Sequence, residues 1–212
     1  MSKFLTSAVR RHLSALRMLL LLTVVTGIVY PLAVTGVAQA AFHDRANGSQ
    51  VKQNGHVVGS SLLGQSFNLP TENPGTSKST AEVAKPDPKW FQPRPSAGGY
   101  DPLASGASNL GPNDPDLIKS IKDLRKAVAA FDGVDPASVP ADALTSSGSG
   151  LDPEISPAYA YEQVNRVAKA RGLTADTVHK LVADHVVDRD LGFLGAKRVN
   201  VLDLNRALAT LR

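Results

Sequence analysis

No cysteine occurs among the 212 residues of the sequence. A chain without cysteine forms no disulfide and no thiolate metal site, so its stability depends on its hydrophobic core and its partners. The G-x-S-x-G elbow of many hydrolases is missing as well, and no two of the five histidines are three or four residues apart. We therefore expect a chain that is not itself an enzyme, with no catalytic residue and no metal site.

Acidic residues are absent from the sequence before Asp44. Basic residues are not: four precede position 18, namely Lys3, Arg10, Arg11 and Arg17. The other 19 of the 23 Lys and Arg residues balance the 19 Asp and Glu residues, so the chain after Met18 is formally neutral. The net charge of +4 therefore belongs to the amino-terminal end, and we expect no nucleic-acid partner.

Charged residues are also absent from Met18 to Phe42. A helix of about 25 residues is roughly 37 Å long, enough to cross the roughly 30 Å core of a bilayer. We predict a transmembrane helix at 18–42 in the cell (inner) membrane. The basic flank predicts a cytoplasmic tail at 1–17, which places residues 43–212 in an extracytoplasmic domain.

A cleaved signal peptide is the alternative to this anchor, because Ala38-Gln39-Ala40 has the small-x-small form of a cleavage site. The apolar run exceeds the roughly 7–15 residues of a signal peptide, and this length favours the anchor. The small residues Gly36 and Ala40 are four apart, as in helices that pack in membranes, and Pro31 should kink the helix. Packing against lipid alone and packing against other membrane helices both stay open, and the small residues favour the second.

The remainder of the sequence predicts an α+β domain that is mostly helical, with a few strands at its start. Asn54-Gly55 is a turn signal before a strand within 57–67, and residues 70–89 have the composition of an exposed loop. Residues 90–115 are rich in Gly and Pro, which predicts an ordered loop pinned by its aromatic residues, Trp90, Phe91 and Tyr100. Helices should begin after four capping positions: Asn113 or Asp114, Ser156, Thr174 and Asn200.

Two stretches suggest a ligand site at first sight. Residues 147–150 (SGSG) expose backbone N–H groups but lack the lysine of a phosphate loop, which favours a tight turn or a partner-facing loop. Residues 163–183 resemble a helix-turn-helix, but the would-be recognition helix carries the acidic residues Asp176 and Asp184. We interpret this segment as part of a helical hairpin that packs within the domain, in which one helix runs unbroken from Ser156 to Gly172.

Several separate motifs match one family in order. They comprise Thr26-Gly27, Tyr30-Pro31-Leu32, Ala38-Gln39, Gly59-Ser60, Gly64-Gln65, Phe91, Arg94-Pro95-Ser96-Ala97, Tyr100-Asp101, Ser105-Gly106, Ser108-Asn109-Leu110-Gly111-Pro112, Ser147 to Pro153, Ile155-Ser156-Pro157, Gln163, Arg166-Val167-Ala168 and Arg198 to Asn205. The chain resembles the C subunit of the Kdp-type P-type potassium-transporting ATPase. It departs from the family pattern at Ala107 (usually Gly), at Glu154 (usually His) and at Ala196-Lys197 (usually Glu-Pro).

The resemblance implies an accessory, non-catalytic subunit of a high-affinity, ATP-driven potassium uptake complex. The implied partners are a channel-like subunit that selects potassium, a P-type pump subunit that hydrolyses ATP, a small single-helix subunit and membrane lipid. It also implies a catalytic chaperone that raises the ATP affinity of the pump subunit. A membrane-anchored extracytoplasmic binding module unrelated to ion transport stays open as an alternative.

The resemblance and the span together give two groups of candidate site residues. Candidates for packing in the membrane are Thr26, Gly27, Tyr30, Pro31, Gly36 and Gln39. Candidates in the loops of the family motifs are Arg94, Ser108, Asn109, Gly111, Ser147, Gly148, Ser149, Gly150, Asp152 and Gln163.

Overall fold

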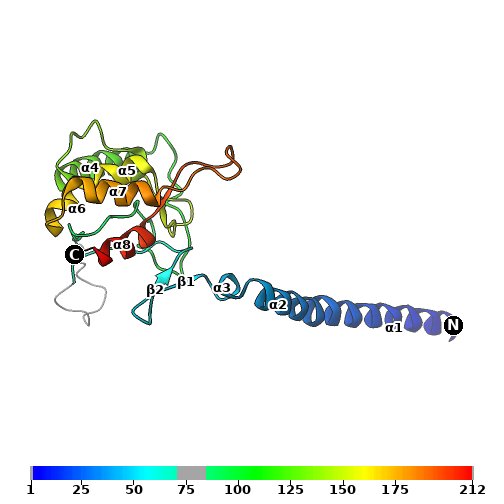
Figure 1. Ribbon diagram of the computed structural model, residues 1–212. Helices are drawn as coiled ribbons and strands as arrows, with labels where there is room; N and C mark the ends of the chain where they lie inside the picture. Colours follow the sequence, from blue (N-terminus) through cyan, green and yellow to red (C-terminus); the bar gives the residue numbers. More distant parts are fainter. Residues whose placement is uncertain (1, 71–84, 212) are drawn as a thin grey trace. The chain divides into compact units, whose positions relative to one another are not determined.

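The computed structural model describes residues 2–70 and 85–211 (Figure 1). The chain divides into two compact units, Met1–Gln50 and Val51–Arg212. The first unit is helical, and the second contains both helices and short strands. The predicted α+β class, with one apolar helix at the amino-terminal end, is confirmed.

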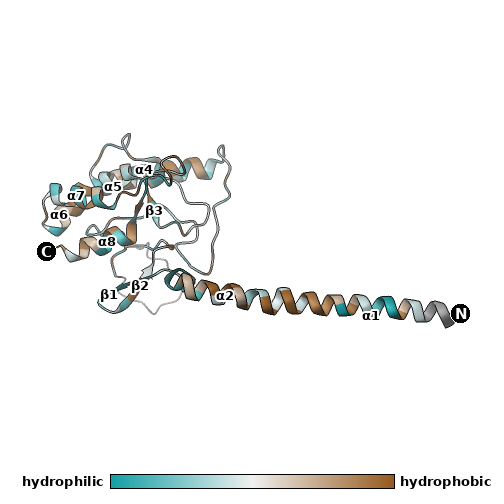
Figure 2. Ribbon diagram, turned by 45° about the vertical axis from the view of Figure 1, so that its right-hand side comes forward, coloured by the Kyte–Doolittle hydropathy of each residue, from teal (hydrophilic) through white to brown (hydrophobic). Residues whose placement is uncertain are grey.

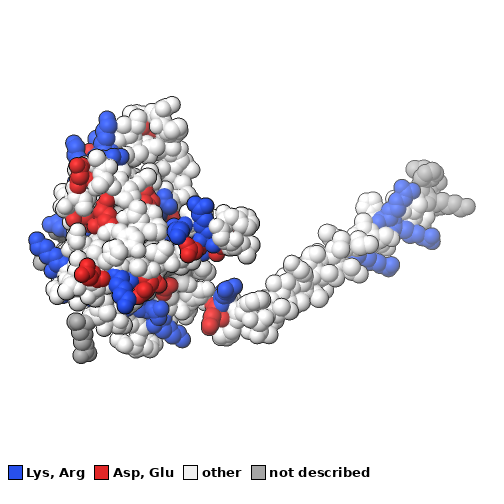
Figure 3. Space-filling model, turned by 45° about the horizontal axis from the view of Figure 1, so that its top comes forward, with Lys and Arg blue, Asp and Glu red and all other residues white. Residues whose placement is uncertain are grey.

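The first unit is dominated by one long helical stretch. It consists of α1 (Ser2–Val24), a π-helical turn η1 (Val25–Val29) and α2 (Tyr30–Ala41), followed by the short helix α3 (His43–Ala46). Residues Thr6–Ala41 are long and apolar enough to cross a membrane. Figure 2 shows the apolar residues along this stretch, and Figure 3 shows Lys and Arg gathered near its amino-terminal end. The helix begins well before Met18, so the basic tail is helical and continuous with the predicted span.

The π-helical turn lies directly before Pro31 and follows from its chemistry. Proline has no N–H, and its ring collides with the carbonyl four residues earlier in an α-helix. In the structure the turn before Pro31 is wider than an α-helical turn, because the Tyr30 N–H donates to the Val25 carbonyl five residues earlier. Such single π turns inside α-helices are frequent at functional positions.

The second unit begins with a hairpin of β1 (Gln50–Gln53) and β2 (His56–Ser60). The turn between them has positive φ at Asn54 (51°) and Gly55 (82°), the conformation that a two-residue hairpin favours. The predicted turn and strand are confirmed, although the strand ends at Ser60. A second sheet pairs β3 (Glu154–Ile155) with β4 (Val199–Asn200) in antiparallel register. The prediction placed strands only at the start of this domain and missed this pair, because two-residue strands leave no alternating pattern.

Helices are the main regular elements of the second unit, and irregular segments connect them. Four helices begin where a side-chain cap was predicted: α4 (Pro115–Asp132), α5 (Pro157–Glu162), α7 (Ala175–His185) and α8 (Val201–Thr210). The caps are Asp114, Ser156, Thr174 and Asn200, whose side chains each accept a hydrogen bond from a first-turn N–H. A short 3-10 turn, η2, covers Ala141–Ala143.

One helix that was predicted to be continuous is broken in the structure, so this prediction is wrong. The expected run from Ser156 to Gly172 is broken at Gln163 into α5 and α6 (Val164–Arg171). Gln163 is fully buried and its side chain binds the backbone of Gln92, so a tertiary contact decides the break. The hairpin that follows packs as predicted, since α6 lies against α7 across the Gly172 turn.

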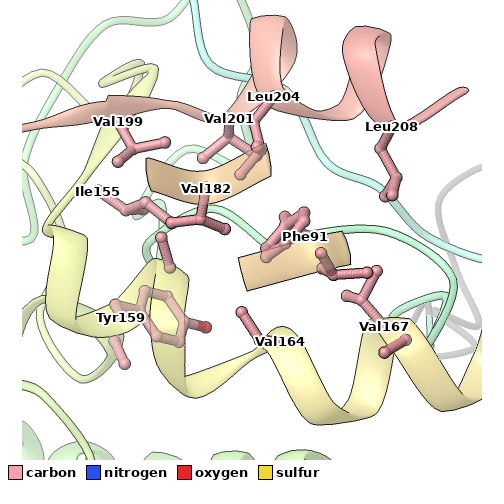
Figure 4. Close-up of a cluster of buried hydrophobic side chains, with 14 of the residues drawn as sticks. Phe91, Ile155, Tyr159, Val164, Val167, Val182, Val199, Val201, Leu204 and Leu208 are labelled. Carbon is pink, nitrogen blue, oxygen red and sulfur yellow. The ribbon is translucent and has the colours of Figure 1, made fainter. Parts of the chain in front are cut away.

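The core lies between the helices α5 to α8 and a segment without regular structure. Figure 4 shows Phe91 from this segment among Val164 and Val167 of α6, Val182 of α7 and the leucines of α8. Phe91, Leu204 and Leu208 are all 0% exposed. Residues 90–114 contain no helix or strand, which confirms the predicted ordered loop. Of the predicted exposed loop at 70–89, residues 71–84 lie outside the described residues, and this part stays a prediction.

Candidate functional site

An irregular segment, Pro88–Gln92, begins with a turn and crosses the domain as a strap without strand neighbours. The Phe91 N–H donates to Asn205 Oδ1 at 2.9 Å, and Asn205 Nδ2 donates back to the Phe91 carbonyl at 2.9 Å. The Gln92 N–H donates to Gln163 Oε1 at 2.6 Å, and Gln163 Nε2 donates to the Gln92 carbonyl at 3.1 Å. Two buried side-chain amides thus supply the paired bonds that a neighbouring strand would give.

Arg166 of α6 binds the same strap from another side. Its Nη1 donates to the carbonyls of Pro88 (2.7 Å) and Trp90 (2.9 Å), and its Nη2 donates to Gln163 Oε1 at 2.6 Å. Its Nε lies 2.5 Å from Asp132 Oδ1, and both side chains of this ion pair are at most 5% exposed. Removing one partner of such a pair would leave a buried charge, which typically costs about 3–5 kcal/mol.

The outer side of the strap is covered by Arg171. Its guanidinium lies 4.2 Å from the centre of the Trp90 ring, and its Nε donates to the Lys89 carbonyl at 2.8 Å. Trp90 also packs on Phe67, with ring centres 6.2 Å apart. The strap is therefore fixed along its length by side chains from α6, α8 and the α5–α6 junction.

Two loops rich in Gly and Ser lie side by side after the strap, and we call residues 94–106 and 145–152 the loop framework. Arg94 Nη1 forms an ion pair with Asp152 Oδ2 at 2.9 Å, and its Nη2 donates to the Thr145 carbonyl at 3.2 Å. Ser96 Oγ donates to the Gly150 carbonyl at 2.6 Å. Four predicted residues, Arg94, Ser149, Gly150 and Asp152, are thus brought together here.

Gly150 is required where the two loops meet. Its φ is +67°, and a Cβ at this position would lie 2.7 Å from the Gly106 carbonyl oxygen. The Gly106 N–H and the Ser105 hydroxyl both donate to the Ser149 carbonyl, at 2.8 and 3.0 Å. Glycine tolerates this backbone conformation and leaves room for the other loop.

The remaining loop candidates are not part of this contact. Ser108, Asn109 and Gly111 are exposed, and Asn109 has a φ of 57° with its side chain donating to Ala107. Ser147 is 6% exposed and lies 3.4 Å from the Ser149 hydroxyl. The Gly150 and Leu151 N–H groups both bond within the turn, to the Ser147 carbonyl and to Ser149 Oγ. These internal bonds favour the tight turn over an anion cradle at 147–150.

A groove of about 460 Å³ runs between α4 and the loop framework. Phe131, Val128 and Leu124 of α4 line one side, and Pro93 and Tyr100 line the other. Burial raises the pKa of the Tyr100 hydroxyl, the Asp152 carboxylate adds to this rise, and the hydroxyl donates to the Arg94 carbonyl at 2.5 Å. Among residues 2–70 and 85–211, no three His, Asp or Glu side chains gather where they would hold a metal ion.

The membrane candidates lie along the long helix. Thr26 donates to the Leu22 carbonyl of its own helix at 2.7 Å, and Tyr30 is 65% exposed. Beyond the neighbouring residues and the backbone of its own helix, a Cβ added at Gly27 or Gly36 would meet no atom of the described chain within 4 Å. Gln39 exchanges two amide hydrogen bonds with Asn47, at 3.1 and 3.2 Å, and this pair holds α3 against the end of α2.

Comparison with known proteins decides the family. Residues 12–210 match the family described as KdpC, the K+-transporting ATPase c chain. The chain belongs to the KdpC family. A relative from Streptomyces coelicolor is 51% identical over 100% of this chain and 97% of its own length. One from Kineococcus radiotolerans is 50% identical over 98% of this chain and 97% of its own length. One from Mycobacterium tuberculosis is 47% identical over 94% of this chain and 97% of its own length. All three are described as potassium-transporting ATPase KdpC subunits.

Family membership accounts for the resemblance, and the structure shows what several of its motifs do. The F-x-x-R-P-S-A motif forms the end of the strap and the start of the loop framework, and the S-G-S-G-L-D-P motif forms the opposing loop. Sequence reasoning selected Gln163 but missed Asn205 and Arg166 as positioning residues. Their signal was a polar residue at helical spacing from a buried position, since Asn205 follows Val201 by four positions and Arg166 follows Gln163 by three.

The Gly150→Ala change should destabilise the second unit, because the added Cβ meets the Gly106 carbonyl and the left-handed backbone is strained. We expect a loss of about 2 kcal/mol or more in the free energy of unfolding, measured by urea denaturation. Gly148→Ala is the matched control, because nothing lies within 4 Å of its added Cβ. It should stay within about 0.5 kcal/mol of the original chain, and equal losses in both variants would contradict the assigned role of Gly150.

Glu162, at the end of α5, gives a pH-dependent prediction. Its buried Oε1 has no hydrogen-bond partner among the described residues, and burial, together with Asp132 and Asp142, raises the pKa of Glu162 to about 7. A carboxyl whose pKa is raised in the folded state stabilises the fold most below its unfolded pKa of about 4.3, and this contribution is lost as the pH rises through 7.

The unfolding free energy should therefore fall between about pH 5 and pH 7 more steeply in the original chain than in Glu162→Gln. Chemical denaturation at several pH values measures both profiles, and the difference between them isolates Glu162 from other titrating groups. Parallel profiles would show that the Glu162 carboxyl titrates normally in the folded protein.

Proposed function

We propose that this chain is an accessory subunit of a high-affinity, ATP-driven potassium uptake complex, and that it stabilises the assembly of that complex. Membership of the KdpC family over residues 12–210 is the observation that carries this proposal. The relatives from Streptomyces coelicolor and Kineococcus radiotolerans are each described as a subunit of a potassium-transporting ATPase. Transported potassium and ATP hydrolysis then belong to partner subunits: a channel-like subunit, a P-type pump subunit and a small single-helix subunit.

The long helix supports the proposed place of the chain in a membrane. Thr6–Ala41 supplies one span, and the basic residues near its amino-terminal end support a cytoplasmic amino terminus by the positive-inside rule. The compact unit Val51–Arg212 then lies outside the cytoplasm. The mixed charges on its surface suit contact with other subunits better than contact with a polyanion.

The arrangement of polar groups supports a binding role for the second unit. The buried polar side chains Gln163, Arg166 and Asn205 bind the backbone of the strap, and the loop framework closes on itself. These contacts hold the loops in one shape, which lowers the entropy lost on docking. A rigid surface presented beside a channel-like subunit would shape the outer entrance for potassium.

A finer part of the proposal concerns ATP. In the role of a catalytic chaperone, the chain raises the ATP affinity of the pump subunit. On the proposed topology only the tail at 1–17 shares a compartment with ATP, so the effect would pass through contacts of the long helix with its neighbours. The alternative, a binding module unrelated to ion transport, finds less support, because the match to the family covers nearly the whole chain.

Co-purification of the full chain in detergent tests the proposal. The original chain should bring a P-type potassium-transporting ATPase with it, whereas Gly36→Leu and Pro31→Leu should reduce the recovered complex severalfold. A Cβ added at Gly36 meets nothing within 4 Å beyond its own helix, so a loss would come from a neighbouring helix. Pro31→Leu removes the constraint that the π-helical turn accommodates.

Val37→Leu, at an exposed apolar position of the same helix, is the matched control and should assemble normally. Thermal unfolding of the second unit should be equal in all variants, because the substitutions lie in the first unit. Recovery of Gly36→Leu at normal stoichiometry would contradict the packing role, and failure of the original chain to bring any ATPase subunit would contradict the proposed function.

A further inference from the structure

A long hairpin, residues 187–198, projects from the second unit between α7 and β4, and we call it the projecting hairpin. Figure 1 shows it in orange, reaching away from the helices. Its base is closed by reciprocal bonds between Val187 and Arg198, at 2.8 and 3.0 Å. Its outer part is closed by reciprocal bonds between Asp190 and Leu194, at 3.0 and 2.9 Å.

The tip of the projecting hairpin is apolar. Leu191 is 83% exposed, Phe193 69% and Leu194 49%. The backbone at the tip is nevertheless ordered: Leu191 and Gly192 have φ values of 54° and 82°, and the Phe193 N–H bonds to the Asp190 carbonyl at 3.3 Å. Three large apolar side chains held together in water by a built turn indicate an interaction surface.

Ion pairs stiffen the base of the projecting hairpin. Lys197 binds Asp188 across the hairpin at 2.8 Å, and Arg198 binds Glu154 of β3 at 3.0 Å and Asp190 at 3.4 Å. The attachment continues into the core, because β4 pairs with β3 and Val199 is fully buried. The tip is therefore held in a defined direction relative to the helices of the second unit.

Two departures from the family pattern lie at this base. Glu154 stands where the pattern usually has His, and Ala196 stands where it usually has Glu, two residues before Arg198. In this chain Arg198 pairs with two carboxylates, Glu154 of β3 and Asp190 of the projecting hairpin.

We propose that the tip of the projecting hairpin, Leu191, Phe193 and Leu194, docks into an apolar pocket on an extracytoplasmic surface of a partner subunit. This inference rests on the proposed function, since it needs a multi-subunit complex. Each anchor buried in such a pocket contributes the transfer of a large apolar side chain out of water. The ordered backbone lowers the entropic cost of docking, as in preorganised binding loops.

The charges around the tip favour a protein partner over a lipid surface. Asp188, Arg189 and Asp190 directly precede the tip and together carry a net charge of −1. The cations that follow the tip, Lys197 and Arg198, are paired with these aspartates or with Glu154. Anionic headgroups attract unpaired Lys and Arg, and the membrane interface favours Trp and Tyr. Residues 187–198 contain neither Trp nor Tyr.

Substitutions at the tip of the full chain, co-expressed with its transporter, test the proposal. Phe193→Ser and Leu191→Ser should each speed the loss of the chain from the purified complex about tenfold, measured by the fraction still bound with time after dilution. Leu103→Ser is the matched control, because Leu103 is 94% exposed but lies outside the projecting hairpin. It should leave the dissociation rate unchanged, and thermal unfolding should be equal in all three variants. Equal dissociation rates in tip variants and control would overturn the proposal.

Photo-crosslinking identifies what the tip touches. With p-benzoylphenylalanine in place of Phe193, irradiation of the intact complex in membranes should join the chain to another subunit polypeptide. Adducts with lipid only, with a second copy of this chain, or with nothing would overturn the docking proposal. If the chain still brings the ATPase subunits in those cases, the proposed function stands without it; if no ATPase subunit accompanies the original chain, both fall.

Discussion

Paired hydrogen bonds between two buried amides and the backbone of Phe91 and Gln92 are the contact on which the second unit depends. The strap has no strand beside it, so its polar backbone would enter the core unsatisfied without Asn205 and Gln163. Unsatisfied buried groups cost about 1–3 kcal/mol each, comparable to a sizeable part of domain stability. Because the strap is fixed, Phe91 fills the core and the loop framework starts from a defined position three residues later.

This arrangement explains how a small domain without disulfides keeps long irregular loops in one shape. The loop framework closes by an ion pair, a serine hydroxyl and a close approach of Gly150 to the Gly106 carbonyl. The projecting hairpin is likewise tied to β3 by Arg198. A domain built to hold surfaces rigid, with a long apolar helix in the same chain, suits a subunit that acts by contact with others.

Local signals predicted much of the fold. Caps at Asp114, Ser156, Thr174 and Asn200, the Asn54-Gly55 turn and the apolar helix all depend on neighbours in sequence, and all were found from the sequence. The β3–β4 pair and the break at Gln163 depend on residues far apart in the chain, so no local pattern contains them. For the site, the resemblance pointed to Arg94, Gly150 and Asp152, which lie together in the loop framework. The backbone that Asn205 binds and the pairing of Arg198 with Glu154 join distant parts of the chain, so only the structure shows them.

Native-state hydrogen exchange of the Phe91 and Gln92 amides tests the central claim most directly. Both lie outside any helix or strand, yet the account predicts that they exchange only through global unfolding, with the same protection free energy as the amides of Leu204 and Leu208 in α8. Exchange as fast as that of exposed loop amides such as Asn109 would show that the strap opens independently, and would contradict the account.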